Sequence, residues 1–137
     1  MLILIGNHKG GVGKSTIAAH AAVRIAMMGH SVALIDADPQ ETSWRWCDQR
    51  ARLRRNAPPV HGERLHGDLS EGVEALARRY RHLVVDCPGA DGDALRSGLE
   101  LAQRVVVPSR VASRDMAALE QVADRVTAAN RVRSEPI

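Results

Sequence analysis

The sequence is poor in aromatic residues, in cysteine and in lysine, and each shortage excludes a class of function. Its 137 residues include two Trp, one Tyr and no Phe, so a surface that binds nucleic acid by stacking bases on aromatic rings is not expected. The two cysteines, Cys47 and Cys87, cannot form a disulfide framework or a four-ligand zinc site alone. No apolar run approaches the roughly 18 residues that indicate a membrane span.

The N-terminus also lacks the pattern of a secretory signal, because no positive residue precedes the apolar stretch 1–5. By elimination we expect a cytoplasmic protein that does not bind a membrane. The length predicts one domain, residues 1–137, since a domain holds roughly 150 residues. A composition of 45% hydrophobic and 26% charged residues is typical of a globular domain.

Lysine is the scarce basic residue, and its two occurrences are close together. Of 19 Lys and Arg residues only Lys9 and Lys14 are lysine, and both lie in one glycine-rich stretch. Because the chain uses arginine elsewhere, these positions suggest a need for a compact ammonium on a flexible stem. The net charge of +3 permits a polyanionic partner without requiring one.

Apolar patterning predicts an α/β fold. Short apolar runs predict strands at 2–6, 31–35, 82–86 and 104–107. Helical spacing of apolar residues predicts helices at 15–28, 43–55, 69–80, 93–102 and 114–129. Between them, 56–67 is predicted as loop with at most one short strand, and its histidines as solvated. Continuous apolar strands that alternate with helices indicate a mostly parallel sheet of four or five strands, flanked by helices on both faces.

The strongest functional signal is the glycine-rich segment between the first strand and the first helix. It reads Lys9-Gly10-Gly11-Val12-Gly13-Lys14-Ser15-Thr16. Glycines let backbone N–H groups converge on a phosphate, and the helix N-terminus adds its dipole. Lys14, expected on the surface, would reach the β- and γ-phosphates, and the Ser15 hydroxyl would bind Mg²⁺. The segment therefore predicts ATP and Mg²⁺ as cofactors, although His8 replaces the first glycine of the standard loop.

Acidic residues follow the next two clear strands. Asp86 ends one of them and can hold Mg²⁺ through a water molecule, because magnesium takes few protein ligands and keeps several waters. Asp36 and Asp38 follow the other, and either belong to the same site or cap the loop after it. Asp91 and Asp93 either cap the next helix or belong to a loop that senses the γ-phosphate.

These motifs together resemble the deviant Walker A ATPases of the ParA/MinD group. The glycine-rich segment resembles the family's Walker A motif, and 83–88 resembles its Walker B motif. Asp36-Ala37-Asp38-Pro39-Gln40 is similar to the second acidic motif, in the form typical of the ParA branch. The match covers nearly the whole chain, and is loose over 108–115. It implies the P-loop NTPase fold of the deviant Walker A type, without the C-terminal strands and adenine-binding loop with which family members continue.

The resemblance implies a role for each site residue. The residue matching Asp38 positions the attacking water, and the one matching Asp36 supports a metal shell formed with Ser15 and Asp86. The residue matching Lys9 reaches the nucleotide of a partner subunit. This implies a homodimer in the ATP state, with each site completed in trans.

The resemblance implies an ATPase for plasmid or chromosome segregation, with slow hydrolysis that a centromere-binding partner protein stimulates. One alternative is a nucleotide-binding and dimerisation module that does not hydrolyse ATP. Another is a MinD-like positioning ATPase, which is disfavoured because 131–137 is too short and polar for an amphipathic membrane helix.

The helix 43–55 offers a candidate surface for DNA. Its arginines are Arg45, Arg50, Arg52, Arg54 and Arg55. They either bind phosphates without sequence preference or form a solvated charged face. In the first case the protein would be associated with the nucleoid.

Overall fold

The computed structural model describes residues 1–7, 9–54, 56–89, 92–109 and 113–136. Strands and helices alternate along these residues, as the apolar pattern predicts. The strands are β1 (Leu2–Ile5), β2 (Val32–Asp36), β3 (His61–Arg64), β4 (His82–Asp86) and β5 (Arg104–Val106). The helices are α1 (Lys14–Met27), α2 (Thr42–Leu53), α3 (Ser70–Ala77), α4 (Asp93–Leu101) and α5 (Ser113–Asn130).

The five strands form one sheet in the order β3-β2-β4-β1-β5. All four neighbouring pairs are parallel, which confirms the predicted fold class. The register places Ile5 and Asp36 on either side of Asp86. The carboxyl ends of three neighbouring strands therefore meet at one edge of the sheet, where ligands bind in folds of this kind.

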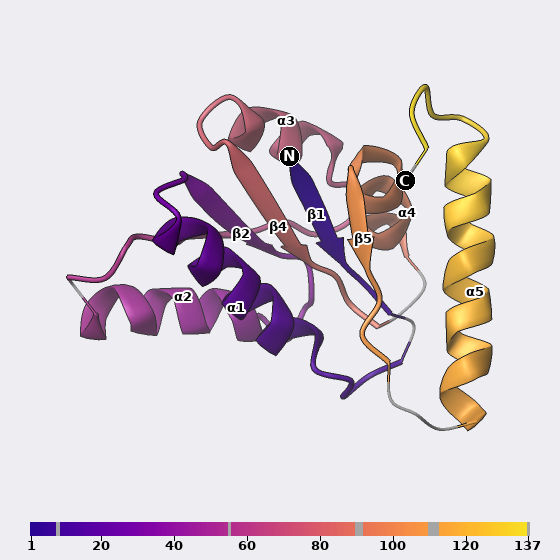
Figure 1. The fold of residues 1–137 in the computed structure, drawn as a ribbon, viewed down its shortest axis with the longest axis horizontal. Coiled ribbons are helices and arrows are strands. Elements are labelled where there is room, and N and C mark those ends of the chain that lie inside the picture. Colours follow the sequence, from indigo (N-terminus) through magenta and orange to yellow (C-terminus); the bar gives the residue numbers. More distant parts are fainter. Residues whose placement is uncertain (8, 55, 90–91, 110–112, 137) are drawn as a thin grey trace.

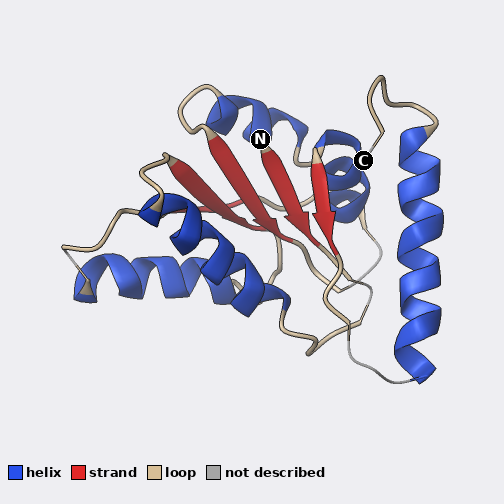
Figure 2. Cartoon of the chain, viewed as in Figure 1, coloured by secondary structure: helices blue, strands red, loops and turns tan. Residues whose placement is uncertain are grey.

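Helices cover both faces of the sheet, with α1 and α2 on one face and α3 and α4 on the other (Figures 1 and 2). Successive strand side chains point to opposite faces, so Leu34 and Val84 pack under α1 and α2 while Ile35 and Val85 pack toward α3 and α4. This two-sided burial explains why the inner strands β1, β2 and β4 carry continuous apolar runs. Helix α5 packs on α4, beside the sheet (Figure 1).

Strand β3 corrects the placement of His61 in a loop. Residues 61–64 pair with β2 only, at the edge of the sheet. The His61 ring stacks on Tyr80 at 5.1 Å, and its Nε2 lies 3.2 Å from Glu63 Oε2. An edge strand needs one partner and stays half solvated, so it can be polar and carries no apolar run for the pattern to detect. Among the described residues, no helix is long and apolar enough to cross a membrane.

Candidate nucleotide-binding site

Residues 9–13 of the glycine-rich segment form the turn that joins β1 to α1, and Lys14, Ser15 and Thr16 are the first residues of that helix. Gly11 and Gly13 have φ angles of 70° and 92°, in the left-handed region where side chains with a Cβ are strained. The Gly13 carbonyl accepts a hydrogen bond from the Ile17 amide at 2.9 Å, which starts α1. Within the described residues, no side chain caps this helix N-terminus and no acidic residue lies in its first turn. Its N–H groups and dipole therefore suit an anion.

Lys14 is buried, so the expectation that it lies on the surface is wrong. Its side chain is 8% exposed, and its Nζ donates a hydrogen bond to the Lys9 carbonyl at 3.2 Å. The side chain folds back over the turn because a backbone carbonyl there can accept from the ammonium. This contact holds the positive charge at the mouth of the turn, at the carboxyl edge of the sheet.

Asn7 anchors the start of the turn, and the sequence analysis missed it. Its side chain is fully buried, and its Nδ2 donates to the Pro108 carbonyl at 2.6 Å. Its Oδ1 accepts from the Lys9 amide at 3.0 Å. Asn7 thus ties the turn to the segment after β5. The signal available in the sequence was an asparagine close after an apolar strand, because a polar side chain buried there needs hydrogen-bond partners.

Asp36 and Asp38 both cap the loop that follows β2. The Asp36 carboxylate, fully buried, accepts from the Asp38 amide at 3.0 Å and from the Trp44 amide at 2.8 Å. Asp38, half-buried, accepts from the Gln40 amide at 2.9 Å. The capping interpretation is therefore confirmed, and it orders the loop beside the turn. Glu41 follows with φ of 51°, a strained conformation of the kind found at functional sites.

Asp86, at the carboxyl end of β4, is the third acidic residue of the candidate site. It is 1% exposed, and its Oδ2 is buried without a hydrogen-bond partner among the described residues. Burial raises the pKa of Asp86 to about 6, and the Asp36 charge adds to this effect. The Ser15 and Ser43 hydroxyls and the Lys14 ammonium act in the opposite direction. The first turns of α1 and α2 thus bring hydroxyls and one cation to this carboxylate.

The residues around Asp86 fit a magnesium ion. The Ser43 Oγ is, like Asp86 Oδ2, buried without a hydrogen-bond partner among the described residues. Nowhere in the described part of the chain do three or more His, Cys, Asp or Glu side chains gather as metal ligands. A hydroxyl and one carboxylate suit Mg²⁺, which keeps waters and binds phosphate oxygens. The sequence analysis missed Ser43, which lies just after the start of α2.

The cysteines are inert. Cys87, next to Asp86, is fully buried, as expected of a small core residue. Burial raises the pKa of the Cys87 thiol to about 12, and the Asp86 charge adds to the shift. Burial also raises the pKa of Cys47 to about 12. A thiol that does not ionise near neutral pH is a poor nucleophile and metal ligand.

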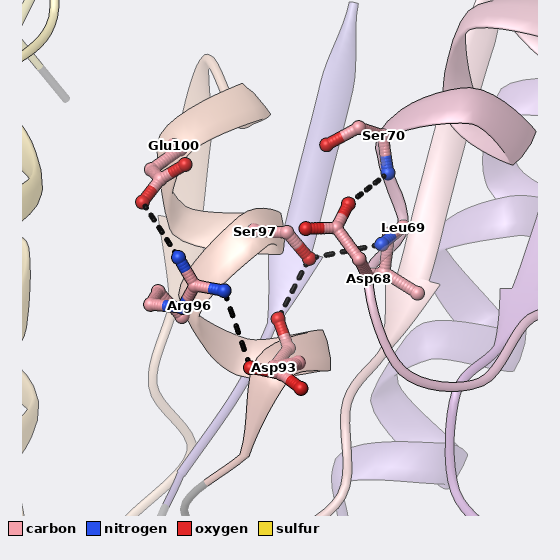
Figure 3. Close-up of polar contacts among 7 residues, drawn as sticks. All are labelled: Asp68, Leu69, Ser70, Asp93, Arg96, Ser97 and Glu100. Atoms are coloured by element: carbon pink, nitrogen blue, oxygen red, sulfur yellow. Dashed lines mark hydrogen bonds and ion pairs between the residues drawn. The ribbon is translucent and has the colours of Figure 1, made fainter.

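Helix α4 is joined by a hydrogen bond to the start of α3 (Figure 3). Ser97 Oγ accepts from the Leu69 amide at 3.0 Å and donates to the Asp93 carbonyl at 2.7 Å. The Asp93 carboxylate pairs with Arg96 at 3.2 Å and makes no cap, so the capping interpretation of Asp93 is wrong. Asp91 lies outside the described residues.

The arginines predicted as one basic surface lie on two different faces of α2. Arg45 and Arg52 are seven residues apart and share one face of the helix, whereas Arg50 and Arg54 share another. Arg55 lies outside the described residues. The two faces cannot contact the same stretch of a ligand together.

Comparison with known proteins shows the family to which the chain belongs. The family model described as ATPase MipZ matches residues 1–135. The chain belongs to the MipZ ATPase family. The resemblance to ParA/MinD-type P-loop ATPases is thereby confirmed.

Relatives of this MipZ family member act in partition or positioning, by their names. The chain is 33% identical to maintenance of carboxysome distribution protein A of Gloeobacter kilaueensis, covering 90% of the chain and 56% of the relative. It is 30% identical to the chromosome-partitioning ATPase Soj of Thermus thermophilus, covering 96% and 62%. The chain thus spans little more than half the length of such relatives.

A solved structure shares the fold of this MipZ family member. The plasmid partition protein of Borrelia burgdorferi B31 bound to AMPPNP superposes with a TM-score of 0.79 at 19% identity. The match covers 94% of this chain and 69% of that chain. At this identity the likeness shows the fold, a parallel five-stranded sheet flanked by helices.

Proposed function

We propose that this chain binds Mg-ATP at the glycine-rich segment 9–16 and hydrolyses it slowly, as a partition or positioning ATPase whose nucleotide state controls dimerisation. One observation carries the proposal. The turn, two hydroxyls and the Lys14 ammonium surround Asp86, a buried carboxylate with an oxygen that has no partner among the described residues. A buried charge needs a compensating partner, and a cation held with phosphates supplies one.

Within this site each residue has a distinct task. The backbone N–H groups of the turn would hold phosphate oxygens, and Lys14 would move its ammonium from the Lys9 carbonyl to the β- and γ-phosphates. Ser15 and Asp86 would hold Mg²⁺, which when bound neutralises phosphate charge. Asp36 supports the shell indirectly, because its two backbone hydrogen bonds order the loop beside Asp86.

Two further tasks depend on the ATP state. Asp38, half-buried in the same loop, would orient the attacking water. Lys9 would cross to the nucleotide of a second subunit. The Asn7 side chain supports this role, because it binds the Lys9 amide and so keeps the start of the turn in place. The ATP-bound form would then be a homodimer.

The proposed sequence of ATP binding, dimerisation and hydrolysis involves two partners. A centromere-binding protein would stimulate hydrolysis, and non-specific DNA would bind the ATP dimer and retain it on the nucleoid. On α2, Arg45 and Arg52 are exposed on one face and are the better candidates for phosphate contacts. If so, replacing each with alanine lowers the log–log salt slope of DNA binding by about one unit.

A second candidate function is the positioning of a cargo other than DNA. The relative named for carboxysome distribution favours it. Both functions use the same nucleotide site, so the site does not discriminate between them. Pull-down with duplex DNA in the presence of ATP tests the partition function, which requires DNA retention, and a chain that binds ATP but retains no DNA would favour the second candidate.

Calorimetry with Mg-ATP tests the nucleotide site. We expect Lys14→Ala to lower affinity by roughly 10- to 100-fold, the worth of a charge-assisted hydrogen bond to phosphate. Arg104→Ala removes an exposed cation at the start of β5, at the opposite edge of the sheet from the turn, and serves as the matched control. Circular dichroism verifies that the Lys14 variant folds, since that side chain is buried. Equal ATP affinity in parent and Lys14 variant would refute the assignment.

A further inference from the structure

A hollow of about 490 Å³ lies between α1 and α2, beyond the glycine-rich turn. Helix α1 contributes His20 and Val23 to its lining, and α2 contributes Trp46, Arg50, Leu53 and Arg54. Trp46, Arg50 and Leu53 are three, four or seven positions apart, which places them on one face of α2. Arg54 follows Arg50 by four positions. We call this hollow the α1–α2 groove.

The apolar surface extends beyond the groove. A second hollow shares Arg50 and Arg54 with it and continues to Pro58–Val60, where a third begins. Leu53 in the groove is 71% exposed, and Met27 in the third hollow is 62% exposed. Exposed apolar side chains that gather along a groove mark a binding surface, whereas single exposed apolar side chains are common on any protein.

Positive charge borders these hollows. Of the described residues that line the three hollows, none is Asp or Glu. Arg50 lies 5.9 Å from the centroid of the Trp46 ring and donates to the Pro58 carbonyl at 3.0 Å. Its Nε is buried without a hydrogen-bond partner among the described residues. On the other face of α2, by contrast, Arg52 is neutralised by Asp48 at 2.9 Å.

We propose that the α1–α2 groove binds an acidic amphipathic helix of a partner protein. The apolar side chains of this partner helix would cover Val23, Trp46 and Leu53, and the carboxylates of the helix would pair with Arg50 and Arg54. A depression between two helices is the shape that receives a third helix. A second copy of this chain is a poor occupant, because its own basic residues would repel Arg50 and Arg54 of this groove. DNA is also a poor occupant, because phosphates gain nothing from the apolar side chains of Val23, Trp46 and Leu53.

A designed peptide of about 18 residues, long enough to form a helix, tests the proposal by fluorescence anisotropy. It carries Leu at helical spacing and Glu elsewhere, and a matched peptide carries Lys in place of Glu. We expect the full chain to bind the acidic peptide and not the basic one. Arg54→Glu and Leu53→Ser should each weaken binding by roughly tenfold or more. Both side chains are exposed, so neither change should unfold the protein.

Arg52→Glu is the matched control, because it makes the same charge change on the other face of α2. Binding of the acidic peptide within about twofold of the parent is expected for it. Failure of the parent to bind the acidic peptide, or an equal loss in the Arg52 variant, would overturn the proposal. The proposal would also be overturned if the parent bound duplex DNA but not the acidic peptide, and if Arg54→Glu abolished that DNA binding. Mg-ATP titration of the same samples tests the nucleotide site separately.

Discussion

Replacing Asp86 with asparagine should stabilise the protein in the absence of nucleotide while removing its response to Mg-ATP. The folded state buries this carboxylate, which raises its pKa from 3.8 to about 6. A shift of about 2 units corresponds to roughly 3 kcal/mol between the protonated and ionised forms. The ionised carboxylate therefore costs about 3 kcal/mol of folding stability above pH 7, and the neutral amide of Asp86→Asn avoids this cost.

The sign of the pH dependence follows from the direction of the shift. The folded state keeps the proton up to about pH 6, whereas the unfolded chain loses it near 3.8. The free energy of unfolding of the parent should thus fall as pH rises from about 4 to about 6, relative to Asp86→Asn. The variant should be more stable by up to about 3 kcal/mol at pH 7.5, and the difference should vanish near pH 4.

Urea unfolding followed by circular dichroism, without magnesium and at several pH values, measures this difference. Asp48→Asn removes a charge that is 42% exposed and is the control, with an expected change below about 1 kcal/mol. Added Mg-ATP should raise the stability of the parent and not that of Asp86→Asn. A variant less stable than the parent at pH 7.5, or a difference that does not depend on pH, would refute the reasoning.

Three other substitutions test separate parts of the site and its scaffold. Lys9→Ala should leave nucleotide affinity of the monomer nearly intact but weaken dimerisation with a slowly hydrolysed ATP analogue, as measured by sedimentation; undiminished dimerisation would contradict the trans role. Gly13→Ala should cost about 1 kcal/mol in urea unfolding, because its φ of 92° strains a Cβ that meets no neighbour within 4 Å. Ser97→Ala should cost about 1–3 kcal/mol by leaving the buried Leu69 amide unpaired, without changing ATP affinity; a loss of affinity would show that this contact also shapes the nucleotide site.

Features set by neighbouring residues could be predicted before any fold was known. β1 and residues 32–35 and 83–85 of β2 and β4 are continuously apolar because both faces are covered, so a short window of sequence reveals these strands. The glycine-rich segment 9–16 was equally visible, because its glycines permit the left-handed backbone that Gly11 and Gly13 adopt. The family resemblance, which the ATPase MipZ match confirms, was carried by such local motifs.

Features that depend on distant residues emerged only from the folded chain. The order β3-β2-β4-β1-β5 sets Asp86 beside Asp36, fifty positions earlier, and leaves one buried oxygen of Asp86 without a partner among the described residues. Asn7, after β1, donates a hydrogen bond to Pro108, after the neighbouring strand β5 and 101 positions later in the sequence. One short strand was allowed within 56–67, but β3 could not be located there because an edge strand can be polar. Lys14 was misplaced because its burial depends on a carbonyl five residues back. Local periodicity reports which face of an element is covered, whereas crossover connections decide what covers it.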